Sequence, residues 1–201
     1  MEQILLVEGK DDLFVFSEIF EKHKVKETFK VIEKKGIDPL FKSISIYTKT
    51  DISTIGIIID ADSNINSRWI TLKTILSELG YDFPNEITEI GTIITKESLP
   101  KIGIWVMPNN NKNGMLEDFV NHLIPENDEL ISFVEETLTS LEEKELQNYK
   151  PIHKSKAKIH TWLSWQENPG TPMGLAITKK YLETDNKECK IFIEWINKLY
   201  N

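Results

Sequence analysis

The chain has few of the features that mark secreted, membrane-spanning and strongly basic proteins. Its one cysteine, Cys189, excludes an internal disulfide. No apolar run approaches the roughly 20 residues that cross a bilayer, and the N-terminus has neither the basic nor the apolar segment of a signal peptide. The formal net charge of −8 argues against nucleic-acid binding by bulk electrostatics, because that needs a clustered basic surface. We therefore expect a cytoplasmic protein without a membrane anchor.

Two kinds of site motif are also missing. No glycine-rich dinucleotide fingerprint follows a predicted strand, and a phosphate loop after Gly36 is excluded because Pro39 interrupts it and Phe41 stands where the second glycine belongs. The histidines have no metal-ligand spacing with one another or with Cys189, so no role is expected for them. They are His23, His122, His153 and His160.

The most informative segment is 55–62, which reads Ile-Gly-Ile-Ile-Ile-Asp-Ala-Asp. A continuous β-branched run is typical of a strand that is buried on both faces of a parallel sheet. If the backbone stays extended, the side chains of Asp60 and Asp62 leave the same face, at the edge where open α/β sheets bind ligands. Paired carboxylates of this kind favour Mg²⁺ or Mn²⁺. The alternative is an Asp-rich turn that caps the next helix.

A second acidic group follows the first predicted strand, Ile4–Val7. Glu8 lies at the strand end, before the turn at Gly9, where a carboxylate would face the same edge of the sheet. Asp11 or Asp12 can instead cap the helix that follows, which runs to about Lys24.

Strand and helix patterns continue to alternate along the first 124 residues. The further elements are predicted as strands at Phe29–Glu33, Ile90–Thr95 and Ile102–Met107, as a helix that starts at Gly36-Ile37-Asp38-Pro39 and runs through Tyr47, and as a helix at Trp69–Leu79, with Gly80 as a helix stop. The pattern predicts an α/β fold with about five mostly parallel strands flanked by helices. Trp69 is expected in the core rather than at a base-stacking surface.

Residues 125–201 show only helical patterns, so we expect a core at 1–124 with a helical C-terminal elaboration at 125–201 packed on it. A further acidic pair, Glu117 and Asp118, opens a helix after a polar loop. These two acids either favour the helix dipole or join the other acids. The lysines and tryptophans after residue 150 favour a solvated face with buried indoles over a phosphate-binding surface.

Glu8 after the first strand, together with Asp60-Ala61-Asp62 after a later one, resembles the TOPRIM domain of primases, topoisomerases, ribosomal-RNA maturases and OLD-type nucleases. The resemblance covers roughly residues 1–110 and implies a compact Rossmann-like sheet with Mg²⁺ at its edge. Asp12 matches an acid of the maturase and OLD branches. Because OLD-type nucleases use further acids and a lysine, Glu117, Asp118 and Lys158 are candidates by their position in the chain.

The resemblance implies metal-dependent hydrolysis of DNA or RNA. Asp60 and Asp62 would hold Mg²⁺ or Mn²⁺, with Asp12, Glu117 or Asp118 as further ligands. Glu8 would act as general acid/base or as a ligand of a second metal ion, and Lys10 or Lys158 would stabilise charge on the phosphate. OLD-type proteins carry an ATPase domain that is absent here, so an ATPase partner, as in phage defence, is expected by analogy. The oligomeric state stays open, a dimer included.

Two other hypotheses fit the same residues less closely. The acids could hold a structural cation in a non-catalytic module that binds a protein or nucleic-acid partner. Asp-Ala-Asp could also belong to a nucleotide-sugar transferase or a phosphatase, although a haloacid-type phosphatase needs Thr or Val where Asn64 stands.

Overall fold

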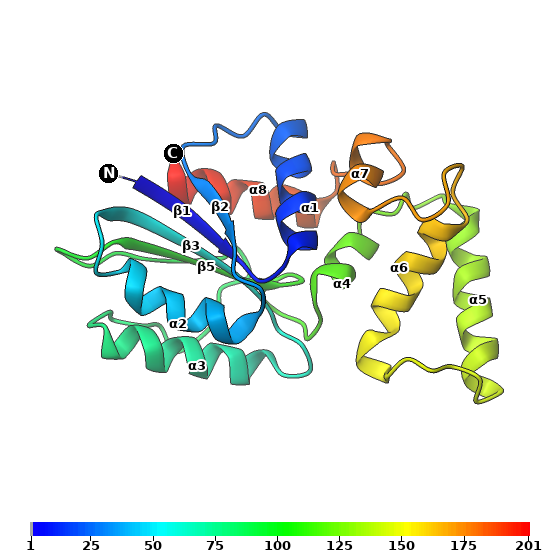
Figure 1. Cartoon of the computed structure of the whole chain (residues 1–201), viewed down its shortest axis with the longest axis horizontal. Coiled ribbons are helices and arrows are strands. Elements are labelled where there is room, and N and C mark those ends of the chain that lie inside the picture. Colours follow the sequence, from blue (N-terminus) through cyan, green and yellow to red (C-terminus); the bar gives the residue numbers. More distant parts are fainter. Residues whose placement is uncertain (1) are drawn as a thin grey trace.

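The computed structural model describes residues 2–201 and contains one five-stranded sheet (Figure 1). The strand order is β2-β1-β3-β5-β4, and every neighbouring pair is parallel except β4 with β5. The strands are β1 (Glu2–Val7), β2 (Lys30–Glu33), β3 (Ile52–Asp60), β4 (Thr92–Ile94) and β5 (Lys101–Met107). The predicted α/β class with about five mostly parallel strands is confirmed.

Eight α-helices and one short 3-10 helix flank this sheet within residues 2–201. They are α1 (Lys10–Lys22), α2 (Ile37–Tyr47), α3 (Ile65–Glu78), α4 (Leu116–Asn121), α5 (Glu129–Glu143), η1 (Pro151–His153), α6 (Lys154–Ser164), α7 (Met173–Thr178) and α8 (Lys187–Tyr200). Helices α2 and α3 cover one face of the sheet, and α1 and α8 cover the other (Figure 1). None of the helices in this part of the chain is long and apolar enough to cross a membrane.

The β-branched run of β3 is explained by burial on both sides. Ile57 and Ile59 pack toward α2 and α3, whereas Ile58 packs toward α1 and α8. A strand between two helical layers has no solvent-facing side, so its sequence cannot alternate between apolar and polar residues. Trp69 is 4% exposed on the α3 side, as predicted for a core residue.

Two glycines let α8 approach the middle of the sheet. Gly56 and Gly103 are direct neighbours on β3 and β5, and a Cβ at either would come closer than 3.0 Å to the side chain of Leu199 or Tyr200. The Tyr200 hydroxyl accepts a hydrogen bond from the Gly56 amide at 3.0 Å and donates one to the carbonyl of Ile4 at 2.5 Å. Helix α8 therefore belongs to the layer that covers the sheet, although it lies within the predicted C-terminal elaboration 125–201.

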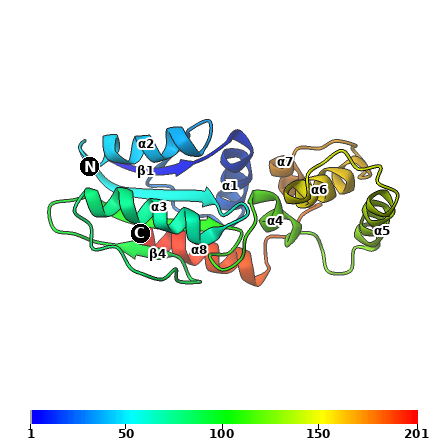
Figure 2. The same cartoon turned by 90° about the horizontal axis from the view of Figure 1, so that it is seen from below.

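The remaining helices of the C-terminal part, together with α4, form a lobe beyond the carboxyl ends of β1 and β3 (Figure 2). Within the lobe, α6 packs against both α4 and α5. The lobe helix α7 packs against α1 of the sheet layer. Because α1 follows β1 directly, the lobe adjoins the end of the sheet where the predicted acids lie.

Element ends differ from the predictions at one strand in particular. The strand predicted at Ile90–Thr95 is reduced to Thr92–Ile94, because Gly91 has a φ of +80° and its amide donates to the carbonyl of Thr88 in a turn. Gly80 has a φ of +93° directly after α3, which confirms the predicted helix stop.

Candidate functional site

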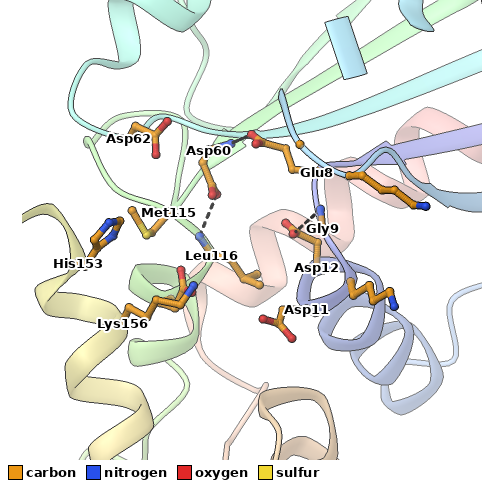
Figure 3. A pocket seen from close by; sticks show the side chains of 14 residues that line it. Glu8, Gly9, Asp11, Asp12, Asp60, Asp62, Met115, Leu116, His153 and Lys156 are labelled. Carbon is orange, nitrogen blue, oxygen red and sulfur yellow. Dashed lines mark hydrogen bonds and ion pairs between the residues drawn. The ribbon is translucent and has the colours of Figure 1, made fainter. Parts of the chain in front are cut away.

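A cavity of about 390 Å³ lies at the carboxyl ends of β1 and β3, between the sheet and the helical lobe (Figure 3). The chain leaves β1 through α1 toward β2, while β3 lies on the other side of β1. Such a reversal of strand order leaves a crevice between the two strand ends, which is where open α/β sheets bind ligands. Of the predicted site residues, six line this cavity. They are Glu8, Lys10, Asp12, Asp60, Asp62 and Glu117.

Backbone amides hold the carboxylates of the two strand ends. Glu8 Oε1 accepts a hydrogen bond from the amide of Asp60 at 2.8 Å, which joins β1 to β3 beyond the last ladder bond. Asp60 Oδ1 accepts one from the amide of Leu116 at 2.9 Å (Figure 3). Three distant segments of the chain therefore meet at Asp60.

Asp12 approaches the same cavity from the first turn of α1. Its Oδ2 accepts a hydrogen bond from the Gly9 amide at 3.0 Å, so the expected capping role is present. Asp12 is nevertheless only 7% exposed and faces the cavity, which a residue that served only as a cap would not require. Capping and cavity lining are combined in one side chain.

The cavity raises the pKa of three carboxyl groups, those of Glu8, Asp12 and Asp60. Burial, followed by the charge of Glu8, raises the pKa of Asp12 from 3.8 to about 7. Burial, followed by the charges of Asp12, Glu8, Glu117 and Asp62, holds the pKa of Asp60 well above its usual range. Burial also raises the pKa of Glu8, against the lowering effect of the Asp60 amide. In the absence of a cation, these groups favour shared protons over full ionisation.

Glu117 is buried, as Asp12 is, whereas Glu8 and Asp60 are half-buried, and Glu117 has a cationic partner. Glu117 is 4% exposed, and its carboxylate pairs with Lys156 Nζ at 2.7 Å. The hydrogen bond that Lys156 donates to Glu117 raises the pKa of Lys156 and keeps the amine charged. Lys156 lies on α6 and lines the cavity, so the lysine of the site is two residues away from the predicted Lys158.

Asp62 lines the cavity together with Asp60, but the backbone between them is not extended. The predicted pair of parallel carboxylates required an extended backbone, whereas Asp62 has a φ of +52° and forms an antiparallel bridge with Gly114. Its carboxylate forms an ion pair with Arg68, and Figure 3 shows it across the cavity from Asp12. The condition for two parallel carboxylates is therefore not met, because of the left-handed turn after β3, although the charge of Asp62 still contributes to the raised pKa of Asp60.

Two other predicted residues lie away from the cavity. Asp118 accepts hydrogen bonds from the Met115 amide at 2.8 Å and from the Ser155 hydroxyl, so it caps α4 and ties α4 to α6. Lys158 pairs with Glu135 of α5 at 2.5 Å on the far side of α6. The structure does not bring either side chain to the other acids.

Several residues of the site, Lys35 among them, had no predicted role. Lys156 and His153 lie on the cavity wall, and Arg68 pairs with Asp62. The sequence does not distinguish Lys156 from its neighbours Lys154 and Lys158, because a lysine-rich helix does not by itself show which of its faces meets the core. The spacing of His153 from the other histidines and from Cys189 predicts no role, because it is the fold that brings this residue to a cavity that Asp62 and Glu117 also line.

Residues 2–201 match the family described as "Protein of unknown function (DUF3226)". The chain belongs to the DUF3226 family. No curated protein and no solved structure matches it. Because the match spans the sheet, the lobe and α8, the acids and Lys156 all lie within the region that defines this DUF3226 protein.

The donor chemistry of the cavity suits a hard divalent cation, since Glu8, Asp12, Asp60 and Glu117 offer only carboxylate oxygens. Within residues 2–201, however, no three His, Cys, Asp or Glu side chains of the DUF3226 protein are already arranged as a set of metal ligands. In both Glu8 and Asp60, one carboxylate oxygen accepts a hydrogen bond from a backbone amide. The second oxygen accepts no hydrogen bond from residues 2–201. The residues therefore fit a cation by chemistry, and rotation of side chains would have to complete the coordination.

Proposed function

We propose that the protein is a TOPRIM-like enzyme that hydrolyses phosphodiester bonds of DNA or RNA with the help of Mg²⁺ or Mn²⁺. The observation that carries this proposal is the meeting of Glu8, Asp12 and Asp60 at the crevice between β1 and β3. Acids that raise one another's pKa values in one cavity destabilise the folded state when no cation is bound. Their presence at one site therefore supports the proposal of a cation site.

Four acids of the cavity take different parts in this proposal. Asp60, Asp12 and Glu117 would hold the cation, which when bound polarises the scissile phosphate and lowers the pKa of a water molecule. Glu8, anchored to the Asp60 amide, would accept or return the proton of the attacking water. Its raised pKa brings the carboxyl group closer to the operating pH, as general acid/base catalysis requires.

Cationic side chains would act on the phosphate. Lys156 and Lys10 both line the cavity, on the lobe and on α1 respectively. An ammonium group in a partly closed site stabilises the additional negative charge of the transition state more than it would in water. Lys156 takes over the role that the sequence analysis assigned to Lys158.

The acidic surface supplies little affinity for nucleic acid at a distance. At a net charge of −8, the protein would repel a polyanion outside the lysine-lined cavity. We therefore also propose that a partner, such as the ATPase of OLD-type systems, delivers the substrate.

A cleavage assay with matched variants tests the enzyme. Supercoiled plasmid, linear DNA and RNA are incubated with the protein and Mg²⁺ or Mn²⁺, and the rate of cleavage is measured for wild type, Asp60→Asn and Asp51→Asn. Asp51 is an exposed acid just before β3, at the opposite end of the same strand. We expect a loss of at least about 100-fold for Asp60→Asn, the scale of a group that acts on the transition state, and no change for Asp51→Asn.

The same assay decides between this proposal and the non-catalytic alternative. The ion pair between Asp62 and Arg68 favours that alternative, because it engages an acid that a metal enzyme would use. Equal cleavage by wild type and Asp60→Asn, or no cleavage with either metal and any of the three substrates, would refute the catalytic assignment in favour of a cation-holding binding module.

A further inference from the structure

Arg68 is the single arginine of the chain, and it lies at the edge of the candidate site. It belongs to the first turns of α3 and forms an ion pair with Asp62. The two side chains are 25% and 35% exposed, so the pair is partly shielded from water. A planar guanidinium holds a carboxylate more firmly than an ammonium group does, since it can donate two parallel hydrogen bonds.

The backbone on both sides of this pair is fixed. The Asp62 amide donates to the carbonyl of Gly114 at 2.8 Å, and the Gly114 amide donates to the carbonyl of Asp62 at 2.9 Å. The start of α3 is held by Asn113, which accepts from the Ile65 amide at 2.9 Å, and by Asn64, which accepts from the Ser67 amide at 3.0 Å. Any change in the partner of Asp62 must therefore come from side-chain rotation.

Asp62 pairs with Arg68 in the structure, but it could turn instead toward a cation held in the cavity by Asp60, Asp12 and Glu117. Its carboxylate lines the cavity that these acids share, and the guanidinium of Arg68 holds it from outside the cavity lining. The charge of Arg68 still reaches the site, because it lowers the pKa of Glu8 while the charge of Asp62 raises it. Arg68 and a metal ion in the cavity would compete for the same carboxylate.

We infer that Arg68 is a positioning residue that competes with the divalent cation for Asp62 and thereby controls when the site fills. This inference rests on the proposed function. When the cation takes Asp62, the guanidinium loses its partner and becomes available to a phosphate group of the nucleic acid, which it suits geometrically. Metal and substrate phosphate then support each other's binding, since each takes one half of the ion pair.

Mn²⁺ affinity measured without substrate tests this competition. Titration followed by electron paramagnetic resonance or calorimetry is performed on wild type, Arg68→Gln, Asp62→Asn and the double variant. Removal of the competitor should tighten Mn²⁺ binding by about three- to tenfold in Arg68→Gln, the scale of a partly exposed ion pair. In the Asp62→Asn background, Arg68→Gln should give a much smaller gain, because the contested carboxylate is gone and only the longer-range repulsion between the guanidinium and Mn²⁺ is removed.

A second variant covers the loss of packing. Arg68→Lys keeps the charge and most of the apolar stem but not the planar fork, so its Mn²⁺ affinity should lie between those of wild type and Arg68→Gln. Thermal melts of each variant in chelator establish that the protein is folded. If Arg68→Gln does not fold, the comparison of Arg68→Lys with wild type, in both Asp62 backgrounds, decides the question.

The outcomes separate this inference from the proposed function. Weaker or unchanged Mn²⁺ binding in Arg68→Gln, or the same gain with and without Asp62, overturns the competition even if the enzyme cleaves nucleic acid. Coupling between Arg68 and Asp62 in a protein that cleaves nothing overturns the catalysis and leaves the competition standing. Absence of Mn²⁺ binding in every variant overturns both.

Discussion

Acidic residues at the sheet edge and on the α5–α6 pair differ in their cationic partners and in the direction of their pKa shifts. On α5, Glu135 pairs with Lys158 at 2.5 Å and Glu142 pairs with Lys154 at 2.6 Å, and each pair joins an exposed side chain to a half-buried one. The hydrogen bond from Lys154 lowers the pKa of Glu142. At the sheet edge, burial and neighbouring carboxylates raise the pKa values of Glu8, Asp12 and Asp60, and no cation within residues 2–201 pairs with any of the three.

The difference shows where the chain tolerates unfavourable electrostatics. Lysines are available on α6 and neutralise nearby acids, yet only Lys156 reaches the buried cluster, where it pairs with Glu117. Backbone amides from Gly9, Asp60 and Leu116 hold the remaining carboxylates in place. An arrangement that costs stability and is kept in place by the fold points to a function for the sheet edge and to simple surface charge pairing on the helices.

The largest effect is expected for Asp60→Asn. In wild type, burial and the charges of four neighbouring acids raise the pKa of the Asp60 carboxyl group. In chelator, the variant should melt several degrees above wild type, because about 1 kcal/mol moves the melting temperature of a domain of this size by roughly 2–4 °C. With Mg²⁺ the difference should shrink or reverse, since the variant binds the cation less tightly. Thermal melts of both proteins, with Asp51→Asn as control, measure this. A less stable Asn variant in chelator, with no Mg²⁺ effect on either protein, would show that Asp60 is a turn residue.

The next effect concerns pH. The folded-state pKa of Asp12, about 7, exceeds the ordinary 3.8, so between these values the folded state binds more protons than the unfolded state. Stability in chelator should therefore fall as pH rises from about 4 to about 7, by at most about 4 kcal/mol from this group. Asp12→Asn keeps an oxygen for the Gly9 amide and should flatten the slope.

Urea unfolding at several pH values checks this prediction. Asp38→Asn, at an exposed acid in the first turn of α2, is the matched control and should keep the wild-type slope. If Asp12→Asn retains the full slope as well, the buried carboxyl group does not take up the proton.

A smaller loss is expected for Lys156→Met. Glu117 would remain buried without its cation, at a cost on the order of 1–3 kcal/mol at neutral pH. Adding Glu117→Gln should recover part of this stability, because the unpaired charge is then removed. Denaturant unfolding of the single and double variants measures the recovery, and a double variant that is no more stable than Lys156→Met would mean that the lysine acts through packing alone.

The smallest effect is expected for Lys158→Met, two residues along the same helix. Glu135 is 57% exposed, so water takes over the role of the lost partner and stability should change by less than about 1 kcal/mol. The same unfolding measurement compares it with Lys156→Met. Equal losses for the two lysine variants would remove the distinction between the sheet edge and the helix pair.

Local patterns predicted the frame of the site well. The β-branched run of β3 and the acids after β1 and β3 placed Glu8 and Asp60 at one sheet edge, because parallel strands end on the same side. The sequence also contains a signal for the close approach of α8. Gly56 and Gly103 interrupt two buried strands, and a glycine in a strand interior often marks close approach of another segment.

By itself, then, the sequence determined the α/β class, the order of strands and helices along the chain, and which strand ends carry acids, since these depend on periodicity and on neighbouring residues. Only the tertiary structure decided the direction of Asp62, the choice of Lys156 over Lys158, and the partnership of Arg68. A left-handed turn reverses a side chain without a strong local pattern, and the face of α6 that meets Glu117 is set by how the lobe packs on the sheet. Contacts between segments far apart in sequence are a property of that packing.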